Sequence, residues 1–179
     1  MIAKYEDIVY TDPKHGETHL RRHLTVPYCQ GNGVDLGSAG LPVVPWAIQV
    51  DHPDNNYDQL IKQSIHLTID AIELPFKNET LDFVYASHLL EDFLYWEPIL
   101  TEWNRVIKIG GHIVLMVPDH ERFRECVRNG QSDNMAHKHE SYPGELTKYY
   151  ACMFNNFTVI EDYITDGYNI LFVAKKTAK

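Results

Sequence analysis

Two short segments constrain the fold of this chain most strongly, GVDLGSAG at 33–40 and IQVD at 48–51. Both have the short, mostly apolar pattern of a buried strand, and the first continues into a glycine-containing turn. Glycine allows a ligand to come close to the backbone, because no Cβ intervenes. An acid at the tip of the next strand can accept hydrogen bonds from both hydroxyls of a ribose. The pair therefore predicts a nucleoside site on an α/β sheet.

Five further segments have the composition of strands. The run LDFVYA is apolar on both faces, as a central parallel strand is. Two segments near the C-terminus flank Thr165-Asp166-Gly167, a turn signal that predicts an antiparallel hairpin. The expected strands are residues 66–69, 81–86, 112–117, 157–164 and 168–175.

The clearest helix is expected over residues 96–108, where apolar side chains recur at i, i+3, i+4 and i+7. Gly110 and Gly111 follow this segment and are interpreted as its C-terminal stop. Shorter helices are expected over 57–64, 121–128 and 144–154, with a loop at 131–142. Strands that alternate with helices and end in a hairpin predict a Rossmann-like, doubly wound α/β sheet, mainly parallel with a C-terminal antiparallel hairpin.

The length of 179 residues is that of one ordinary domain, so residues 1–179 are expected to fold together. Residues 1–30 are mixed and polar, and Pro13 and Gly16 interrupt any long element. This segment is expected to form a short helix or a flap over the sheet edge.

Chemically active side chains fall at or just after the predicted strand ends. In a doubly wound sheet, ligands bind beyond the carboxyl ends of the strands, where the strand order reverses. Five separate segments therefore converge on one edge of the sheet, which is stronger evidence for a site than any one motif. The residues concerned are Asp35 and Gly37, Asp51, Asp70, Ser87 and His88, and Pro118 and Asp119.

Over about residues 31–119, the chain resembles the class I S-adenosylmethionine-dependent methyltransferases, in particular the compact methyltransferase domain. VDLGSAG is similar to the family's first motif, D-x-G-x-G-x-G, and IQVD to its second strand with the ribose-binding acid. TIDAIELPFKNETLDFVYASHLLEDF is similar to the run that includes the adenine-contacting Asp-Ala pair. WNRVIKIGGHIVLMVPD is similar to the R-V-L-K-P-G-G signature of the fifth strand.

This resemblance implies S-adenosylmethionine as the cofactor, and methyl transfer to an oxygen or nitrogen atom of a small acceptor. Asp51 would bind the ribose with His52 beside it, and Asp70 and Ala71 would contact adenine. The methionine part would lie against Asp35, Gly37, Ser38, Ala39 and Gly40, and the sulfonium and acceptor near Ser87 and His88.

The chain departs from the family pattern in its first motif. Ala39 stands at the position of the middle glycine, and Leu41 at that of the last. Only about ten residues separate Gly37 from the next strand, and Pro42 and Pro45 are among them. A full helix is therefore not expected there, which would remove a helix N-terminal dipole from the site.

An oxygen nucleophile would require a general base, for which His88, His120 and His137 are the candidates, with His139 beside them. His137 and His139 are spaced as two metal ligands could be. No third ligand accompanies them, so no metal site is expected.

The formal net charge of −9 argues against a nucleic-acid partner, which would need a basic face. The one candidate basic patch is the run from His19 to His23. Three widely spaced cysteines form no disulfide framework, and no apolar run is long enough to cross a membrane. A cytoplasmic protein without membrane attachment is expected, and its oligomeric state stays open.

Two other functions compete with methyl transfer. A nicotinamide-dinucleotide oxidoreductase would need G-x-G-x-x-G at the start of a helix, whereas this turn reads G-S-A-G-L-P. A non-catalytic protein with the methyltransferase fold, acting through a partner, is compatible with the imperfect first motif.

Overall fold

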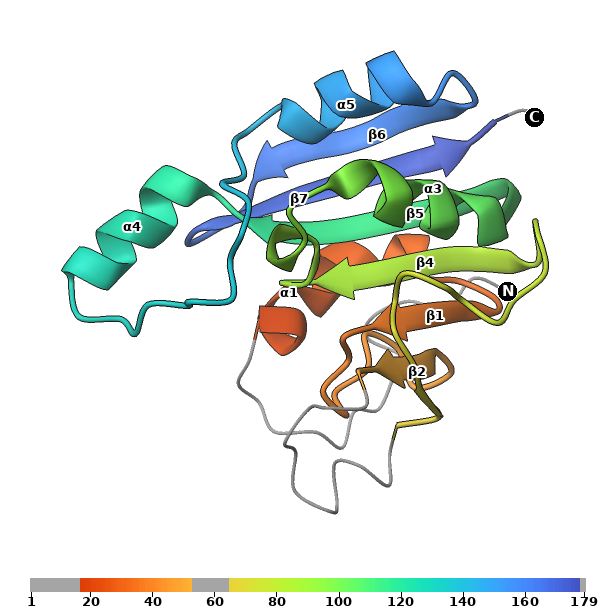
Figure 1. Cartoon of the computed structure of the whole chain (residues 1–179), viewed down its shortest axis with the longest axis horizontal. Coiled ribbons are helices and arrows are strands. Elements are labelled where there is room, and N and C mark those ends of the chain that lie inside the picture. The colour runs from red at the N-terminus through yellow and green to blue at the C-terminus, as the bar shows by residue number, and fades with distance from the viewer. Residues whose placement is uncertain (1–16, 53–64, 178–179) are drawn as a thin grey trace.

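The computed structural model describes residues 17–52 and 65–177, and its strands in this part of the chain form one seven-stranded sheet. The spatial order of the strands is β3-β2-β1-β4-β5-β7-β6 (Figure 1). Their bounds are β1 Gly33–Leu36, β2 Ile48–Asp51, β3 Leu67–Thr68, β4 Leu81–Ser87, β5 Ile107–Pro118, β6 Phe157–Ile164 and β7 Asn169–Lys176.

Strands β1 to β5 are parallel, whereas β7 pairs antiparallel with both β5 and β6. The chain leaves β1 towards β2 and β3 on one side and returns to β4 on the other, so the strand order reverses between β1 and β4. This topology confirms the predicted Rossmann-like sheet with its C-terminal antiparallel hairpin. It also places the carboxyl ends of β1, β2 and β4 side by side.

The helices lie on both faces of the sheet (Figure 1). Helices α3 and α5 pack on one face, and α1 with the short 3-10 helix η2 packs on the other. Helix α4 extends outward beyond the carboxyl end of β5. The bounds are α1 Glu17–Thr25, η2 Val26–Tyr28, η3 Leu90–Asp92, α3 Trp96–Val106, α4 His120–Arg128 and α5 Glu145–Met153.

The core on the α3 side is built around Trp103, which is completely buried. Its indole Nε1 donates a hydrogen bond of 2.8 Å to the carbonyl of Ala71, and its ring meets Phe93 edge to face. Helix α3 therefore supports the segment after β3 directly, at the edge of the sheet where ligands are expected.

The opposite face is covered partly by loop instead of helix. Residues 37–47 contain no helix, as the two prolines in this segment predicted. Val43, Val44 and Ala47 pack beside Phe83 and Tyr85 of β4, and all five are buried. The connection from β1 to β2 thus supplies the apolar cover that a helix would otherwise provide.

The predicted boundary between helix and strand near residue 108 was wrong. Helix α3 ends at Val106, and Ile107 already pairs with Leu81 as part of β5. The glycine pair therefore does not stop the helix. A Cβ at Gly111 would lie 2.7 Å from the carbonyl oxygen of Asp82, so glycine allows β5 to approach β4.

Two expectations concern residues outside the described part in whole or in part. These are the helix at 57–64 and the short helix or flap at 1–30, of which residues 1–16 are not described. Within the remainder of the N-terminal segment, α1 confirms the expected short helix. Among the described residues, no helix is long and apolar enough to cross a membrane.

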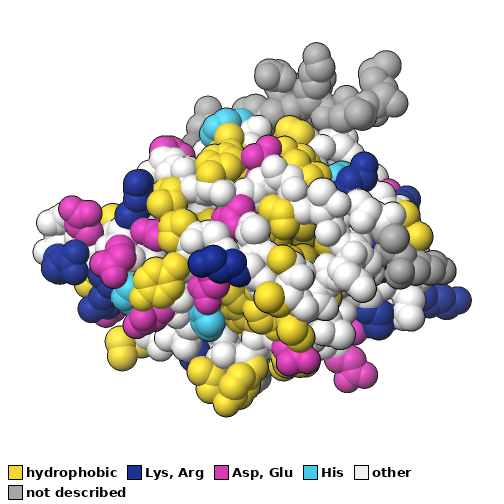
Figure 2. Space-filling view, turned by 90° about the horizontal axis from the view of Figure 1, so that it is seen from above, with side chains coloured by type: hydrophobic (Ala, Val, Ile, Leu, Met, Phe, Trp, Pro, Cys, Tyr) yellow, Lys and Arg dark blue, Asp and Glu magenta, His cyan; other side chains and the backbone are white. Residues whose placement is uncertain are grey.

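The candidate basic patch at 19–23 was also wrong. Arg21 is buried and donates to the carbonyl of Asp166 at 2.7 Å, and buried Arg22 donates to the carbonyl of Pro42 at 2.7 Å. These arginines hold α1 against the fold and do not form a surface. On the face shown in Figure 2, the described Lys and Arg side chains are interspersed with Asp and Glu.

We expect Trp103→Ala to lower the free energy of unfolding by about 3–5 kcal/mol, the usual cost of truncating a buried tryptophan. Trp103→Phe keeps most of the packing and leaves the Ala71 carbonyl without its donor, at a cost of about 1–3 kcal/mol. Urea unfolding followed by circular dichroism measures both values. Equal costs for the two variants would show that the indole N–H contact, and not the ring volume, dominates.

Candidate functional site

Two neighbouring cavities open at the carboxyl ends of β1, β2 and β4. The larger, of about 510 Å³, extends from Asp51 and Asp70 to Asp92, and the smaller, of about 190 Å³, lies between α1 and the turn after β1. Gly37 and His88 line both of them. The two cavities therefore meet where the strand order reverses.

Most of the residues that the sequence predicted for a cofactor line one of these cavities, but Asp35 and Gly40 line neither. The larger cavity is lined by Gly37, Asp51, His52, Asp70, Ala71 and His88. The smaller is lined by Gly37, Ser38, Ala39, Ser87 and His88.

The carboxylate of Asp51 organises the turn after β1. Its Oδ2 accepts from the backbone N–H of Ala39 at 2.8 Å, and its Oδ1 accepts from the N–H of His52 at 2.8 Å. Ala39 has a φ of +49°, close to the left-handed conformation that the glycine of the family pattern would adopt easily. The side chain of Asp51 is buried and lines the larger cavity.

Asp70 lies at the exposed rim of the larger cavity. Its Oδ1 accepts from the backbone N–H of Ile72 at 3.0 Å, which shapes a tight Asx-type turn. The backbone N–H of Ile69 donates to the carbonyl of Asp51 at 3.0 Å and brings the two acids to the same rim.

Asp35 lies beneath the turn instead of facing a cavity. Its buried carboxyl accepts from the N–H of Val43 at 2.6 Å and thereby fastens the β1–β2 connection. Burial raises the pKa of Asp35 to about 8, although the Val43 hydrogen bond and the charge of Arg22 oppose this shift. Asp35 therefore supports the turn from below through its contact with Val43.

His88 stands at the junction of the two cavities in a strained backbone conformation, with a φ of +52°. Its Nδ1 lies 3.3 Å from Oε1 of Glu91, and its Nε2 lies 2.7 Å from Oδ1 of Asn169. The amide of Asn169 is oriented by Glu17, to which its Nδ2 donates at 2.6 Å. Both ring nitrogens of His88 therefore face acceptors.

This arrangement favours the doubly protonated imidazolium. Burial by itself would lower the pKa of His88, but the hydrogen bond and charge of Glu91, with contributions from Glu17 and Asn169, raise it. An imidazole that already carries both protons cannot accept another. The predicted role of His88 as a general base therefore finds no support in the geometry, although the residue lines both cavities.

A family model described as a methyltransferase domain matches residues 22–115 of the chain. The chain belongs to the methyltransferase domain family. A search of curated protein sequences finds no significant match.

Several solved structures share the fold, including two that are described as SAM-dependent methyltransferases. A SAM-dependent methyltransferase from Thermotoga maritima, described as a possible histamine N-methyltransferase, is 20% identical with a TM-score of 0.66, over 83% of each chain. A SAM-dependent methyltransferase from Archaeoglobus fulgidus is 16% identical with a TM-score of 0.66, over 90% of this chain and 95% of the other. A Pyrococcus horikoshii protein is 14% identical with a TM-score of 0.67, over 93% and 97%.

Membership of the methyltransferase domain family identifies S-adenosylmethionine as the cofactor. The residues at the two cavities fit this molecule, because carboxylates dominate the edge and a sulfonium is a cation. One of these carboxylates, Asp92, was missed in the sequence. It lines the larger cavity, and its Oδ1 is buried without a hydrogen-bond partner among the described residues. Burial and the nearby Glu91 raise the pKa of Asp92 to about 6.

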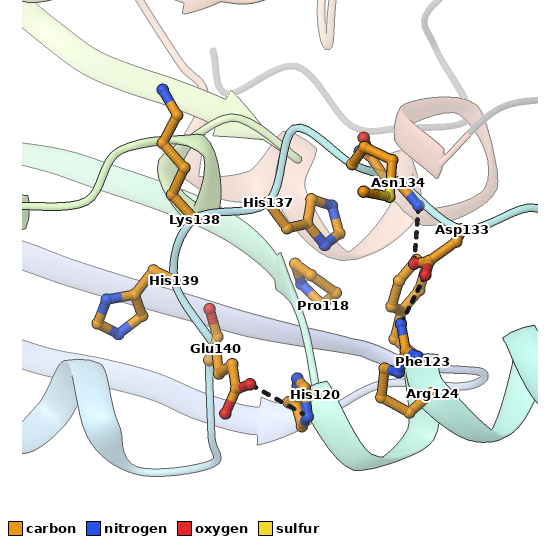
Figure 3. Close-up of a pocket in the computed structure, with 12 residues that line it drawn as sticks. Pro118, His120, Phe123, Arg124, Asp133, Asn134, His137, Lys138, His139 and Glu140 are labelled. Atoms are coloured by element: carbon orange, nitrogen blue, oxygen red, sulfur yellow. Dashed lines mark hydrogen bonds and ion pairs between the residues drawn. The ribbon is translucent and has the colours of Figure 1, made fainter.

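The other candidate bases lie around a third cavity at α4 and residues 133–141 (Figure 3). His120 is 3.7 Å from Glu140, and His137 is 3.6 Å from the same Glu91 oxygen that His88 contacts. His139 bonds Glu145 at 2.8 Å. Within the described ranges, no cluster of three or more His, Cys, Asp or Glu side chains is arranged to hold a metal.

We expect Asp35→Asn to change how stability depends on pH. The pKa of Asp35 is higher in the folded than in the unfolded protein, so the folded protein keeps this proton to a higher pH. The free energy of unfolding therefore falls as pH rises from about 4 towards 8, by at most about 1.4 kcal/mol per pH unit. The amide keeps an acceptor for Val43 and removes this titration. The stability of Asp35→Asn relative to wild type should therefore grow over this range and level off above it.

Urea unfolding at a series of pH values measures this difference, and Glu121→Gln on the exposed surface of α4 serves as a matched acid-to-amide control. A difference between Asp35→Asn and wild type that stays constant with pH would contradict a raised pKa at Asp35.

Proposed function

We propose that the protein transfers a methyl group from S-adenosylmethionine to an oxygen or nitrogen atom of a small acceptor. The observation that carries this proposal is the pair of cavities that meet at Gly37 and His88, with carboxylates along the larger one. When bound, S-adenosylmethionine supplies an electrophilic methyl carbon on a sulfonium. The protein then has to align an acceptor behind that carbon, and alignment alone can account for much of the rate enhancement.

We assign the ribose to Asp51, a buried residue that lines the larger cavity. Asp70 and Ala71, further along the same cavity, are assigned to adenine, with His52 beside the ribose. The methionine part is assigned to the smaller cavity against Ser38 and Ala39. Asp35 and Gly40 take part only by supporting this turn.

The sulfonium is assigned to the junction, near Ser87 and His88. The imidazolium of His88 is neutralised by buried Glu91, so the junction does not repel a cation as an unpaired histidine would. Asp92 adds a carboxylate on the same wall and is a further partner for positive charge in the ligand.

The oxidoreductase alternative receives no support from the site. A pyrophosphate would need a helix N-terminus after β1, and residues 37–47 contain no helix. A non-catalytic protein would bind the cofactor in the same cavities, so only a measurement of turnover distinguishes this alternative from the proposal. Formation of S-adenosylhomocysteine in the presence of a small acceptor would exclude it.

We expect Asp51→Ala to weaken the binding of S-adenosylhomocysteine by about ten- to several hundredfold, because hydrogen bonds to a charged acceptor contribute about 1.5–3 kcal/mol each. Isothermal titration calorimetry measures this change, and circular dichroism checks that the turn held by Asp51 has not unfolded. Glu125→Ala, which removes an exposed carboxylate from α4, is the control. Unchanged affinity in folded Asp51→Ala would remove the ribose assignment.

A further inference from the structure

The third cavity, of about 280 Å³, lies between α4 and the segment 133–141 (Figure 3), and it shares Lys138 with the larger cofactor cavity. Pro118 and Phe123 form its apolar part, and the imidazoles of His120 and His137 turn towards it. Its volume is at the lower limit of the roughly 300–1,000 Å³ typical of ligand pockets. A site of this size accepts a compact molecule.

Ser141 provides a second sign of a ligand at this cavity. Its residue is only 2% exposed, it lines the cavity, and its Oγ has no hydrogen-bond partner among the described residues. A buried hydroxyl without a partner costs free energy, of the order of 1–3 kcal/mol. A ligand that carries a hydrogen-bonding group would remove this cost.

The charges around the cavity are largely balanced within the protein. Arg124 pairs with Asp133 at 2.8 Å, and His120 lies 3.7 Å from Glu140. Lys138 lines both this cavity and the larger cofactor cavity, and in Figure 3 its side chain points away from His120 and Phe123. The balance of charge suits a neutral ligand, with the Ser141 hydroxyl as its polar anchor.

Glu91 connects this cavity with the cofactor junction. Its completely buried carboxylate places the same oxygen, Oε1, 3.3 Å from Nδ1 of His88 and 3.6 Å from Nε2 of His137. The carbonyl of Glu91 also accepts from the backbone N–H groups of Lys138 at 2.8 Å and His139 at 3.0 Å. One residue thus holds the segment 137–139 against the wall of the cofactor site.

The contacts of the two ring nitrogens of His137 suit a general base. Its Nε2 faces Glu91, while no hydrogen bond from a described residue reaches its Nδ1. Burial lowers the pKa of His137, which Glu91 and Asp133 oppose and the charges of His88 and His120 reinforce. The ring is therefore neutral at pH 7, and the carboxylate behind it can stabilise the cation that forms when it gains a proton.

We propose that the third cavity binds the methyl acceptor, a small neutral molecule with a protonated oxygen or nitrogen nucleophile, and that His137 is its general base with Glu91 as the positioning residue. The inference rests on the proposed function. It assigns the two cavities that meet at Gly37 and His88 to the cofactor and the third cavity to the second substrate.

The chemical step balances without a further reactant. The acceptor's lone pair forms the bond to the methyl carbon, and the electron pair of the broken carbon–sulfur bond returns to sulfur. The acceptor's proton passes to Nδ1 of His137. The imidazolium that results lies against Glu91, and the positive charge lost at sulfur has moved to the histidine.

Binding is tested first, with the protein saturated with S-adenosylhomocysteine and phenol and imidazole as the two probes. In proton–nitrogen NMR spectra, at least one probe should shift the backbone signals of Phe123 and Ser141 more than those near Glu17 and Thr18 in the smaller cavity. Ser141→Ala should weaken that probe's binding by about fivefold or more. Shifts confined to the smaller cavity, or binding of neither probe, would overturn the assignment of the acceptor site.

Catalysis is tested with the probe that binds. His137→Gln should lower kcat by about 100-fold or more, the usual contribution of a general base, and leave affinity for S-adenosylhomocysteine within about twofold of wild type. In the wild type, kcat should rise with pH as His137 loses its proton, at a pKa below the ordinary histidine range. This rise should disappear in the variant. His112→Gln, a half-buried histidine on β5 remote from all three cavities, is the matched control.

The outcomes separate the two proposals. Failure of the wild-type protein to bind S-adenosylhomocysteine would refute the proposed function and this inference together. If folded His137→Gln still binds the cofactor and still turns over, with an unchanged dependence of kcat on pH, the role of His137 alone would be overturned.

Discussion

The hydrogen bond between the Asp51 carboxylate and the backbone N–H of Ala39 keeps the ligand edge of the sheet in shape. The chain has no helix after β1 to brace the turn, and Ala39 occupies a left-handed conformation that costs an alanine free energy. Two buried side chains compensate, Asp51 from β2 through the Ala39 N–H and the carboxyl group of Asp35 through the Val43 N–H from below. The turn is thereby fixed against the sheet, and Asp51 also lines the larger cavity.

The carboxylate of Glu91 organises the side of the site formed by His88 and the segment 137–139. Glu91 is completely buried, a costly place for an ionised group unless it is paired. It is paired with His88, which is bonded on its other side to Asn169, and Asn169 in turn bonds Glu17 of α1. This chain of polar contacts joins α1, β7, the turn after β4 and the segment 137–139. The cofactor junction and the third cavity therefore share one electrostatic unit.

The strand segments and their convergence could be predicted from the sequence, because apolar runs and turn residues act locally. The end of α3 could not, since Gly110 and Gly111 look like a helix stop while Gly111 serves a close approach to β4. Arg21 and Arg22 resembled a basic surface, but pairing inside the fold buries them. Asp92 and Ser141 carry no motif, and only their burial without partners distinguishes them.

The sequence by itself determined the parallel sheet, the glycine turn and the acid at the tip of β2, because each depends on residues that are neighbours in the chain. It also determined which histidines come near the ligand edge. Tertiary structure decided what those histidines can do. His88 and His137 approach the same Glu91 oxygen, but only His88 has an acceptor at each nitrogen, so burial and partners assign the proton to one and leave the other neutral.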